Sequence, residues 1–156
     1  MKLRFIVNGI TYNVSCEPNE ILADLLRNRL GLKDVKVGCR SGECGSCTVL
    51  LEGKAVDSCL VLAAEVNRRE VVTIKGLSQE RVSPLQTAFV EEGAIQCGFC
   101  TAGFVLTASA FLREKPNPTA EEIKAAIGGN LCRCTGYEAV IRAVKKASSR
   151  PQGGIR

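Results

Sequence analysis

Eight of the nine cysteines fall into two groups whose spacing is typical of metal sites. The first group is Cys39, Cys44, Cys47 and Cys59, and the second is Cys97, Cys100, Cys132 and Cys134. Thiolates are soft ligands that favour iron–sulfur clusters or zinc. The sequence contains no histidine, which excludes Rieske centres, histidine-ligated zinc or haem, and nucleophiles activated by histidine. The sequence therefore predicts two all-sulfur sites, and electron transfer if the metal is iron.

The first group has the spacing of plant-type two-iron ferredoxins. It reads Cys-x4-Cys-x2-Cys, followed after eleven residues by Cys59. Three ligands on one loop can wrap a cluster while a separate strand supplies the fourth. Three glycines in this loop, Gly38, Gly42 and Gly45, leave room for a close approach of the backbone. Ordinary turn formation is the alternative explanation of these glycines.

The second group pairs a Cys-x2-Cys with a distant Cys-x-Cys, and both pairs lie near expected helix starts. The dipole and free N–H groups of a helix N-terminus lower the pKa of a nearby thiol. Loops that open helices over 100–114 and 136–147 are therefore expected to bring both pairs to a common point as thiolates. Arg133, between two of the cysteines, either adds positive potential or is an ordinary exposed arginine.

Structural zinc is the main alternative to iron at both sites. Taken alone, the second group also fits a zinc site. Catalytic dithiol exchange at Cys97 and Cys100, or at Cys44 and Cys47, leaves the other thiols unexplained. The ninth cysteine, Cys16, is expected to be an inert buried thiol on the core side of a hairpin.

Hydrophobic alternation and turn residues predict a small α+β domain over residues 1–76. The expected strands cover residues 2–7, 10–14, 48–52, 55–60 and 71–74. Asn8-Gly9 and Glu52-Gly53 each join two of these strands, and Asn-Gly is a strong hairpin signal. Leucines at helical spacing predict a helix near 21–30 that ends at Gly31.

Beyond Gly76 the hydrophobic period changes from two to about 3.6 residues, which predicts an all-α domain over residues 77–148. The expected helices cover residues 84–92, 100–114, 120–127 and 136–147. The second of these is apolar nearly all round, so we expect it at the centre of the bundle. The tail at 149–156 is expected to be disordered.

Composition argues against nucleic acid and membranes as partners. The formal charge of +5 counts cysteines as neutral, and two clusters of about −2 each would reduce it to about +1. Aromatic side chains that could interleave with bases are few. We see no apolar run of membrane-spanning length and no signal-peptide core at the N-terminus. We expect a cytoplasmic protein, because thiols stay reduced and available to metal there.

Three segments carry seven of the eight clustered cysteines, namely residues 37–49, 96–101 and 129–137. In that order they resemble the small iron–sulfur subunit of the xanthine dehydrogenase family of molybdenum hydroxylases, which includes bacterial carbon monoxide, nicotinate and aldehyde dehydrogenases. The resemblance extends over nearly the whole chain. Many members have alanine at the position of Ser46 and proline at that of Ala102, and neither departure touches a ligand.

The resemblance implies an α+β chain with an N-terminal β-grasp ferredoxin-like domain followed by a four-helix bundle domain, each holding one [2Fe-2S] cluster. It also implies a hetero-oligomer with a large molybdopterin-binding subunit and an FAD-binding subunit. The second cysteine group would lie next to the molybdopterin and the first would face the flavin. Gln96 and Cys134 match family residues that contact the molybdopterin, although a helix-end hydrogen bond is another explanation of Gln96.

We therefore expect an electron-transfer subunit that passes electrons from molybdenum through two clusters to FAD. The chain has no nucleotide-binding motif and no evident pair of carboxylates for proton transfer, so substrate is expected to react on another subunit, and this sequence does not encode which substrate. A free two-cluster ferredoxin that shuttles by diffusion and a zinc-stabilised interaction module are the alternatives. Co-purification tests the first alternative, and metal analysis tests the second.

Overall fold

Two tight hairpins form most of the N-terminal sheet. In the computed structural model, which describes residues 1–78 and 82–150, β1 (Lys2–Val7) pairs with β2 (Ile10–Ser15), and β3 (Thr48–Leu51) with β4 (Lys54–Asp57). Both turns need two residues with positive φ: 52° and 79° at Asn8-Gly9, and 50° and 79° at Glu52-Gly53. Such turns match the twist of the paired strands, and both predicted hairpins are confirmed.

The fifth strand joins the two hairpins into one mixed sheet. β5 (Glu70–Val72) lies parallel to β1 and antiparallel to β3, which gives the strand order β2-β1-β5-β3-β4. The prediction of a strand over 55–60 is too long, because β4 ends at Asp57 and Ser58 turns toward the cysteine loop. The Ser58 hydroxyl donates a hydrogen bond to the Cys47 carbonyl oxygen at 2.7 Å.

The helix expected near 21–30 is present but changes its winding. One α-helical turn, α1 (Leu22–Asp24), continues as a π-helical segment over Leu25–Arg29. The Leu30 amide donates to the Leu25 carbonyl oxygen at 3.0 Å, five residues back. Gly31, with φ of 72°, ends the segment as predicted. Its leucines bury one face of the sheet in a core that also contains Cys16, which is 4% exposed.

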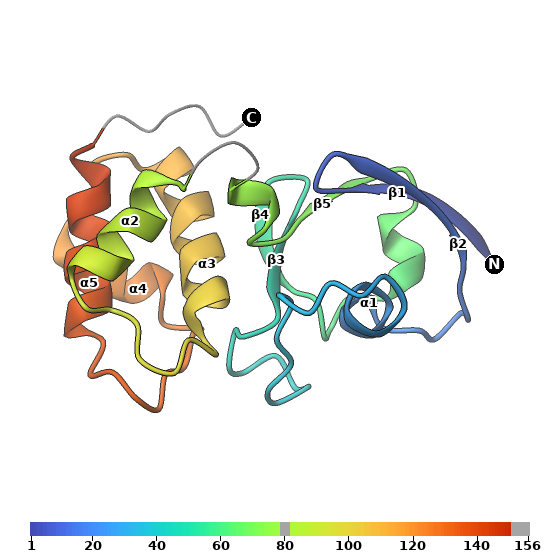
Figure 1. The fold of residues 1–156 in the computed structure, drawn as a ribbon, viewed down its shortest axis with the longest axis horizontal. Helices are drawn as coiled ribbons and strands as arrows, with labels where there is room; N and C mark the ends of the chain where they lie inside the picture. Colours follow the sequence, from blue (N-terminus) through green and yellow to red (C-terminus); the bar gives the residue numbers. More distant parts are fainter. Residues whose placement is uncertain (79–81, 151–156) are drawn as a thin grey trace.

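Four helices build the C-terminal domain: α2 (Pro84–Glu91), α3 (Thr101–Glu114), α4 (Ala120–Ala126) and α5 (Glu138–Ser148). Seven residues of α3 are buried, and α3 contacts the other three helices as well as β3 and β4. Its predicted central position is confirmed, and Figure 1 shows α3 between the rest of the bundle and the sheet.

Strand β3 is shared by the two hydrophobic cores. Val49 belongs to the core of the sheet domain, whereas Leu50 on the opposite face belongs to the core of the helical domain. Successive residues of a strand point to opposite faces, so a strand buried on both faces reads as a continuous apolar run. The two domains therefore meet along β3 and α3.

Helix α5 starts two residues later than predicted. Tyr137 has φ of 67°, in the left-handed region, and the helix begins at Glu138. The Tyr137 ring packs edge-on against Phe104, with centroids 6.2 Å apart, and its hydroxyl bonds the backbone of Cys132. The Tyr137 side chain, which packs against the core of the helical domain, thus also holds the preceding loop.

Two described residues follow α5. Ser149 and Arg150 are described, and Arg150 forms a 2.6 Å ion pair with Glu91; residues 151–156 of the predicted tail lie outside the described residues. None of the helices in the described part of the chain combines the length and the apolar character that crossing a bilayer requires.

Candidate metal centres

The first cysteine group is assembled by a loop that leads into β3 and by the end of β4. Cys39, Cys44 and Cys47 lie on the loop, and Cys59 follows β4 by two residues. Cys47 and Cys59 are buried, at 2% and 6% exposure, and their thiols interact directly. The end of β4 and the loop, which are far apart on an extended chain, are thus brought together as the spacing predicted.

Backbone N–H groups of the loop point at two of its sulfur atoms. The amides of Ser41 and Glu43 donate to Cys39 Sγ at 3.4 Å each, and the amide of Cys39 donates to Cys44 Sγ at 3.4 Å. Hydrogen bonds to sulfur favour the thiolate. Those from Ser41, and then from the amides of Glu43 and Cys44, lower the pKa of Cys39 to about 6.

The fold of this loop depends on residues with positive φ. Arg40, Gly42 and Gly45 have φ values of 61°, 76° and 64°, so the backbone curls and turns its amides inward. The Arg40 guanidinium pairs through both terminal nitrogens with the Asp24 carboxylate, each contact at 2.9 Å. This fork ties the loop to α1 and lowers the pKa of Asp24.

The other two thiols of the first group face the protein interior. Burial raises the pKa of Cys47 to about 12 in the absence of metal, and the neighbouring Cys59 and Asp57 add to the increase. Cys47 Sγ also lies 3.8 Å from a carboxylate oxygen of Asp57, whose own pKa is raised by burial. This half of the group is thus shielded from water, whereas the half with Cys39 is exposed.

The second cysteine group consists of two contacting pairs. Cys100 is the residue that precedes α3, and its thiol interacts with that of Cys132; the thiol of Cys97 interacts with that of Cys134. Gly98, with φ of 82°, turns the loop between Cys97 and Cys100. The predicted meeting of the two pairs is confirmed.

Cys132 is held by two residues of its own loop. The Thr135 hydroxyl and amide donate to Cys132 Sγ at 3.1 and 3.3 Å. The Tyr137 hydroxyl accepts the Cys132 amide at 3.0 Å. Burial acts to raise the pKa of Cys132, but the hydrogen bonds from Thr135, together with those from the Cys134 amide and the Cys100 thiol, bring the pKa down to about 7.

The expected lowering of the thiol pKa by a helix N-terminus is wrong for Cys100. Burial raises the pKa of Cys100 to about 12, with the Cys132 thiol adding to the increase. The amide of Phe99, and then the thiol of Cys134, lower the pKa of Cys97. Desolvation thus outweighs the helix terminus at Cys100, and Cys132 lies six residues before α5, where the macrodipole has faded.

The second group opens into a cavity of about 370 Å³. Its lining contains all four cysteines and Phe99, Leu131, Arg133 and Tyr137. Phe99 and Leu131 are 46% and 51% exposed. Gln96 is exposed beside this loop and is not among the lining residues. Arg133 therefore lines the cavity beside the cysteines. This position favours a contribution of Arg133 to positive potential near the thiols over the role of an ordinary exposed arginine.

The pairing of the thiols suits a two-iron cluster. Within residues 1–78 and 82–150, no group of three or more Cys, Asp or Glu side chains is close enough to hold one metal ion. Thiols interact in three pairs, Cys47 with Cys59, Cys97 with Cys134 and Cys100 with Cys132, and two thiolates on each of two irons is the ligation of a [2Fe-2S] cluster. The inward amides and the Thr135 hydroxyl suit its anionic charge.

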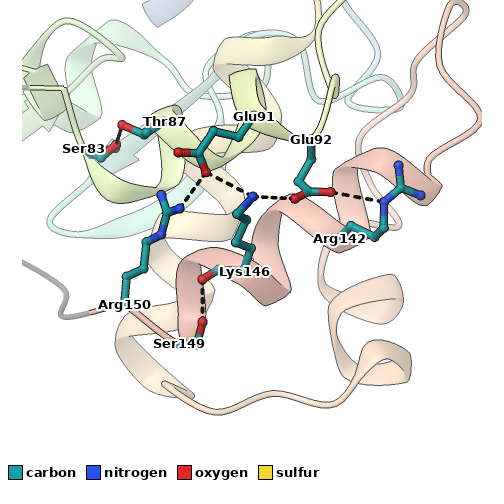
Figure 2. A network of polar contacts seen from close by, with 8 residues as sticks. All are labelled: Ser83, Thr87, Glu91, Glu92, Arg142, Lys146, Ser149 and Arg150. Atoms are coloured by element: carbon teal, nitrogen blue, oxygen red, sulfur yellow. Dashed lines mark hydrogen bonds and ion pairs between the residues drawn. The ribbon is translucent and has the colours of Figure 1, made fainter.

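An ion-pair network fixes the end of α2, from which the second cysteine loop departs (Figure 2). Glu92 pairs with Lys146 at 2.7 Å and Arg142 at 3.3 Å, and Lys146 also reaches Glu91 at 3.2 Å. These contacts join α2 to α5 on the surface. The loop with Cys97 and Cys100 is thus anchored at both ends, by this network and by α3.

Sequence reasoning missed several residues that position the thiols. Asp24 lies in no motif, and Thr135 lies in the segment 129–137 without a role assigned to it, although a hydroxyl three residues after a cysteine is a signal that could have found that role. Asn130 is 3% exposed and donates to the Gly45 carbonyl oxygen at 3.2 Å. This contact spans 85 residues of sequence, so no local pattern reveals it.

Both halves of the chain match known domain families. Residues 5–74 match the 2Fe-2S iron-sulfur cluster binding domain, and residues 73–145 match a second family described as a [2Fe-2S] binding domain. The two matches meet close to the predicted boundary at residues 76 and 77. Each match contains one of the two cysteine groups.

Similar proteins match over nearly the whole chain. The small subunit of nicotine 6-hydroxylase from Paenarthrobacter nicotinovorans is 50% identical over 141 residues, which cover 90% of this chain and 86% of that protein. The small FeS subunit of nicotinate dehydrogenase from Eubacterium barkeri is 47% identical and covers 92% of both. A chain of quinoline 2-oxidoreductase from Pseudomonas putida 86 superposes with a TM-score of 0.91 at 43% identity, covering 95% of this chain and 93% of that one.

Proposed function

Since this chain belongs to the small [2Fe-2S] subunits of the molybdenum hydroxylase family, we propose that its eight clustered cysteines are the ligands of its two clusters. The chain is the electron-transfer subunit of a multi-subunit oxidoreductase complex. Cys39, Cys44, Cys47 and Cys59 bind the cluster of the sheet domain, and Cys97, Cys100, Cys132 and Cys134 bind the cluster of the helical domain. The pairwise approach of the thiols is the observation that carries this assignment.

The contacts also suggest which thiols share an iron. Cys100 pairs with Cys132 and Cys97 with Cys134 in the helical domain, while Cys47 pairs with Cys59 in the sheet domain. The remaining pair is Cys39 with Cys44, which are joined by an amide-to-sulfur hydrogen bond. Metal binding requires all eight as thiolates, so it releases protons from the high-pKa thiols.

Bound clusters supply a one-electron store at each site, and the protein around them sets how readily each store fills. Amide and hydroxyl donors at Cys39 and Cys132 stabilise added negative charge. Burial of Cys47 and Cys59, and partial burial of Cys100, limits the access of water and acts in the opposite direction. The chain thereby provides two one-electron sites of different environment.

We place the helical-domain group toward a large molybdopterin-binding subunit. Two exposed apolar side chains, Phe99 and Leu131, line the cavity with Cys134, and a third, Ile95, precedes Gln96 in the sequence. Exposed apolar patches of this kind mark protein interfaces. Gln96 can offer its amide to a polar ring edge there. Cys134 and its partner Cys97 are the two exposed thiols of this group.

We place the sheet-domain group toward an FAD-binding subunit. Leu60 and Leu62 follow Cys59 and are 60% and 39% exposed, so a second apolar surface adjoins the first cysteine group. Electrons from substrate oxidation then enter at the helical domain and leave from the sheet domain. Two apolar surfaces also favour a subunit over a freely diffusing shuttle.

Two cysteine substitutions in the native complex test the ligand assignment. Cys134→Ser should abolish the EPR signal of the helical-domain cluster and stop electron transfer from substrate to flavin, while the sheet-domain signal remains. Cys16→Ala is the matched control, because this thiol is buried in the core away from both groups; both signals should persist. Loss of both signals in a folded Cys134→Ser variant would show that the partition of ligands is wrong.

A further inference from the structure

Strand β2 forms one edge of the sheet. It is the last strand in the order β2-β1-β5-β3-β4, and Figure 1 shows it on the side of the sheet away from the helical domain. Its antiparallel register with β1 runs without interruption from Lys2 opposite Ser15 to Val7 opposite Ile10. The backbone groups of β2 that point away from β1 therefore belong to a regular edge without a bulge.

Two hydrogen bonds at the start of β1 show which residues of β2 point outward. The Met1 amino group donates to the Cys16 carbonyl oxygen at 2.6 Å, and the Cys16 amide donates to the Met1 carbonyl oxygen at 2.8 Å. Opposed residues of an antiparallel pair alternate between exchanging both hydrogen bonds and exchanging none. Thr11, Asn13 and Ser15 therefore direct their N–H and C=O groups outward, where these groups meet no partner among the residues that the structure describes.

The sequence of β2 does nothing to protect this edge from pairing with another strand. Natural edges are blunted by lysine, proline, a bulge or a covering element, whereas β2 reads Ile-Thr-Tyr-Asn-Val-Ser, with no charge and no proline. The opposite edge is different, because β4 is shorter, carries Lys54 and Asp57, and is contacted by α3. This contrast indicates that the β2 edge is left open for a partner.

Two cations stand beside the edge on one face of the sheet. Lys2 and Arg4 lie opposite Ser15 and Asn13, so all four side chains share that face. Both cations are exposed, and neither forms an ion pair within the described residues. The acidic Glu70 on β5 shares this face but is aligned with the far end of β1. The long cationic side chains can therefore reach over the shorter ones toward the open edge.

We propose that an extended, acidic segment of a partner subunit adds to the five-stranded sheet alongside β2. The chain is a subunit of a multi-subunit complex, and the inference is independent of which cysteines bind the clusters. The outward residues supply three donors and three acceptors over about 13 Å of strand. These backbone groups bind any extended chain, and the two cations select one with carboxylates on their face.

The other face of β2 defines the rest of the pattern. Tyr12 and Val14 are half-buried against the core of the sheet domain, and Ile10 is 60% exposed. A strand presents alternate side chains to the two faces of a sheet, so the added segment needs apolar side chains beside these three residues. The partner segment is thus one in which acidic and apolar residues alternate.

Charge argues against a second copy of this chain as the partner. Two β2 strands paired antiparallel about Asn13 would satisfy the same backbone groups, but Lys2 and Arg4 of both copies would then share one continuous face. Neither β1 nor β2 contains an aspartate or a glutamate that could balance them. Like charges on one face repel, whereas an acidic segment forms ion pairs with both cations.

Hydrogen–deuterium exchange of the native complex, resolved to single residues by mass spectrometry, tests the added strand. The amides of Tyr12 and Val14 point toward β1 and are protected whether or not a partner binds. The outward amides of Thr11, Asn13 and Ser15 should exchange as slowly as these two if the added strand is present, and at least about tenfold faster if the edge is free. Fast exchange at the outward amides would overturn the proposal.

Charge reversal tests the acidic character of the partner segment. In the Lys2→Glu/Arg4→Glu double variant of the complex, the outward amides should exchange at least about tenfold faster than in the unsubstituted complex, while the amides bonded to β1 stay protected. Lys54→Glu, on the opposite edge, is the matched control and should leave exchange in β2 unchanged. Slow exchange at the outward amides of the double variant would refute an acidic partner, and its loss on dilution would identify a second copy of the chain instead.

Discussion

Gly103→Ala provides a quantitative test of the close packing between the domains. Gly103 is buried in the first turn of α3, and the new methyl group would lie 2.1 Å from the Gly45 carbonyl oxygen and 3.2 Å from Asn130 Nδ2. The nearest atom is backbone and cannot swing away as the end of a side chain could. Helix α3 must therefore move away from the loop that carries Cys44 and Cys47.

The expected loss combines three effects of known size. Overpacking costs about 2 kcal/mol, and loss of the Asn130–Gly45 hydrogen bond costs about 1 kcal/mol. The better helix propensity of alanine returns about 1 kcal/mol. The free energy of unfolding should therefore fall by about 2 kcal/mol, which lowers Tm by about 4–8 °C for a domain of this size.

Thermal unfolding of the cluster-loaded protein, followed by circular dichroism, measures this change. Gly129→Ala is the matched control, because its methyl group would meet no atom within 4 Å and its φ is not left-handed; its Tm should change little. A Gly103→Ala protein with a higher Tm would show that helix propensity dominates. The close approach of α3 to the cysteine loop would then be wrong.

Three further predictions concern single contacts. Thr135→Val removes the hydroxyl donor to Cys132 Sγ, so the reduction potential of the helical-domain cluster, measured by EPR-monitored titration, should fall by about 40 mV for a hydrogen bond of about 1 kcal/mol; an unchanged potential would contradict this. Hydrogen bonds from Lys146, and then Arg142, hold the pKa of Glu92 below its usual 4.5, so the network stabilises the protein above about pH 4.5 and this contribution disappears as the pH falls through the lowered pKa. Glu92→Gln should therefore unfold more easily than the unsubstituted protein at neutral pH, with the difference shrinking in acid, and a pH-independent difference would refute the ionic origin. Cys16→Ala should cost about 1 kcal/mol in denaturant unfolding by opening a small cavity with no loss of iron, whereas iron loss would make this thiol a ligand.

Local signals in the sequence were sufficient for the hairpins, the helices and the cysteine groups. Asn8-Gly9 defines its own turn, because the left-handed conformation is a property of those two residues. Cysteine spacing indicates the proposed ligands, because three of the cysteines in the first group lie on one loop. The α+β class and the two [2Fe-2S] domains are confirmed by the family matches.

The features that escaped prediction depend on contacts between distant segments. The pKa of Cys100 is raised because α3 is buried against the rest of the bundle, and a helix N-terminus seen in sequence does not reveal that burial. Tyr137 leaves the helical conformation to reach Cys132. Asn130 and Gly103 matter only because Gly45, from the other domain, packs against both of them.

Chemical analysis of iron and acid-labile sulfide in the native complex tests the central claim most directly. Two [2Fe-2S] clusters on eight thiolates require about four iron and about four sulfide for each copy of this chain. About two zinc ions per chain without labile sulfide, in a colourless and fully folded protein, would contradict the account.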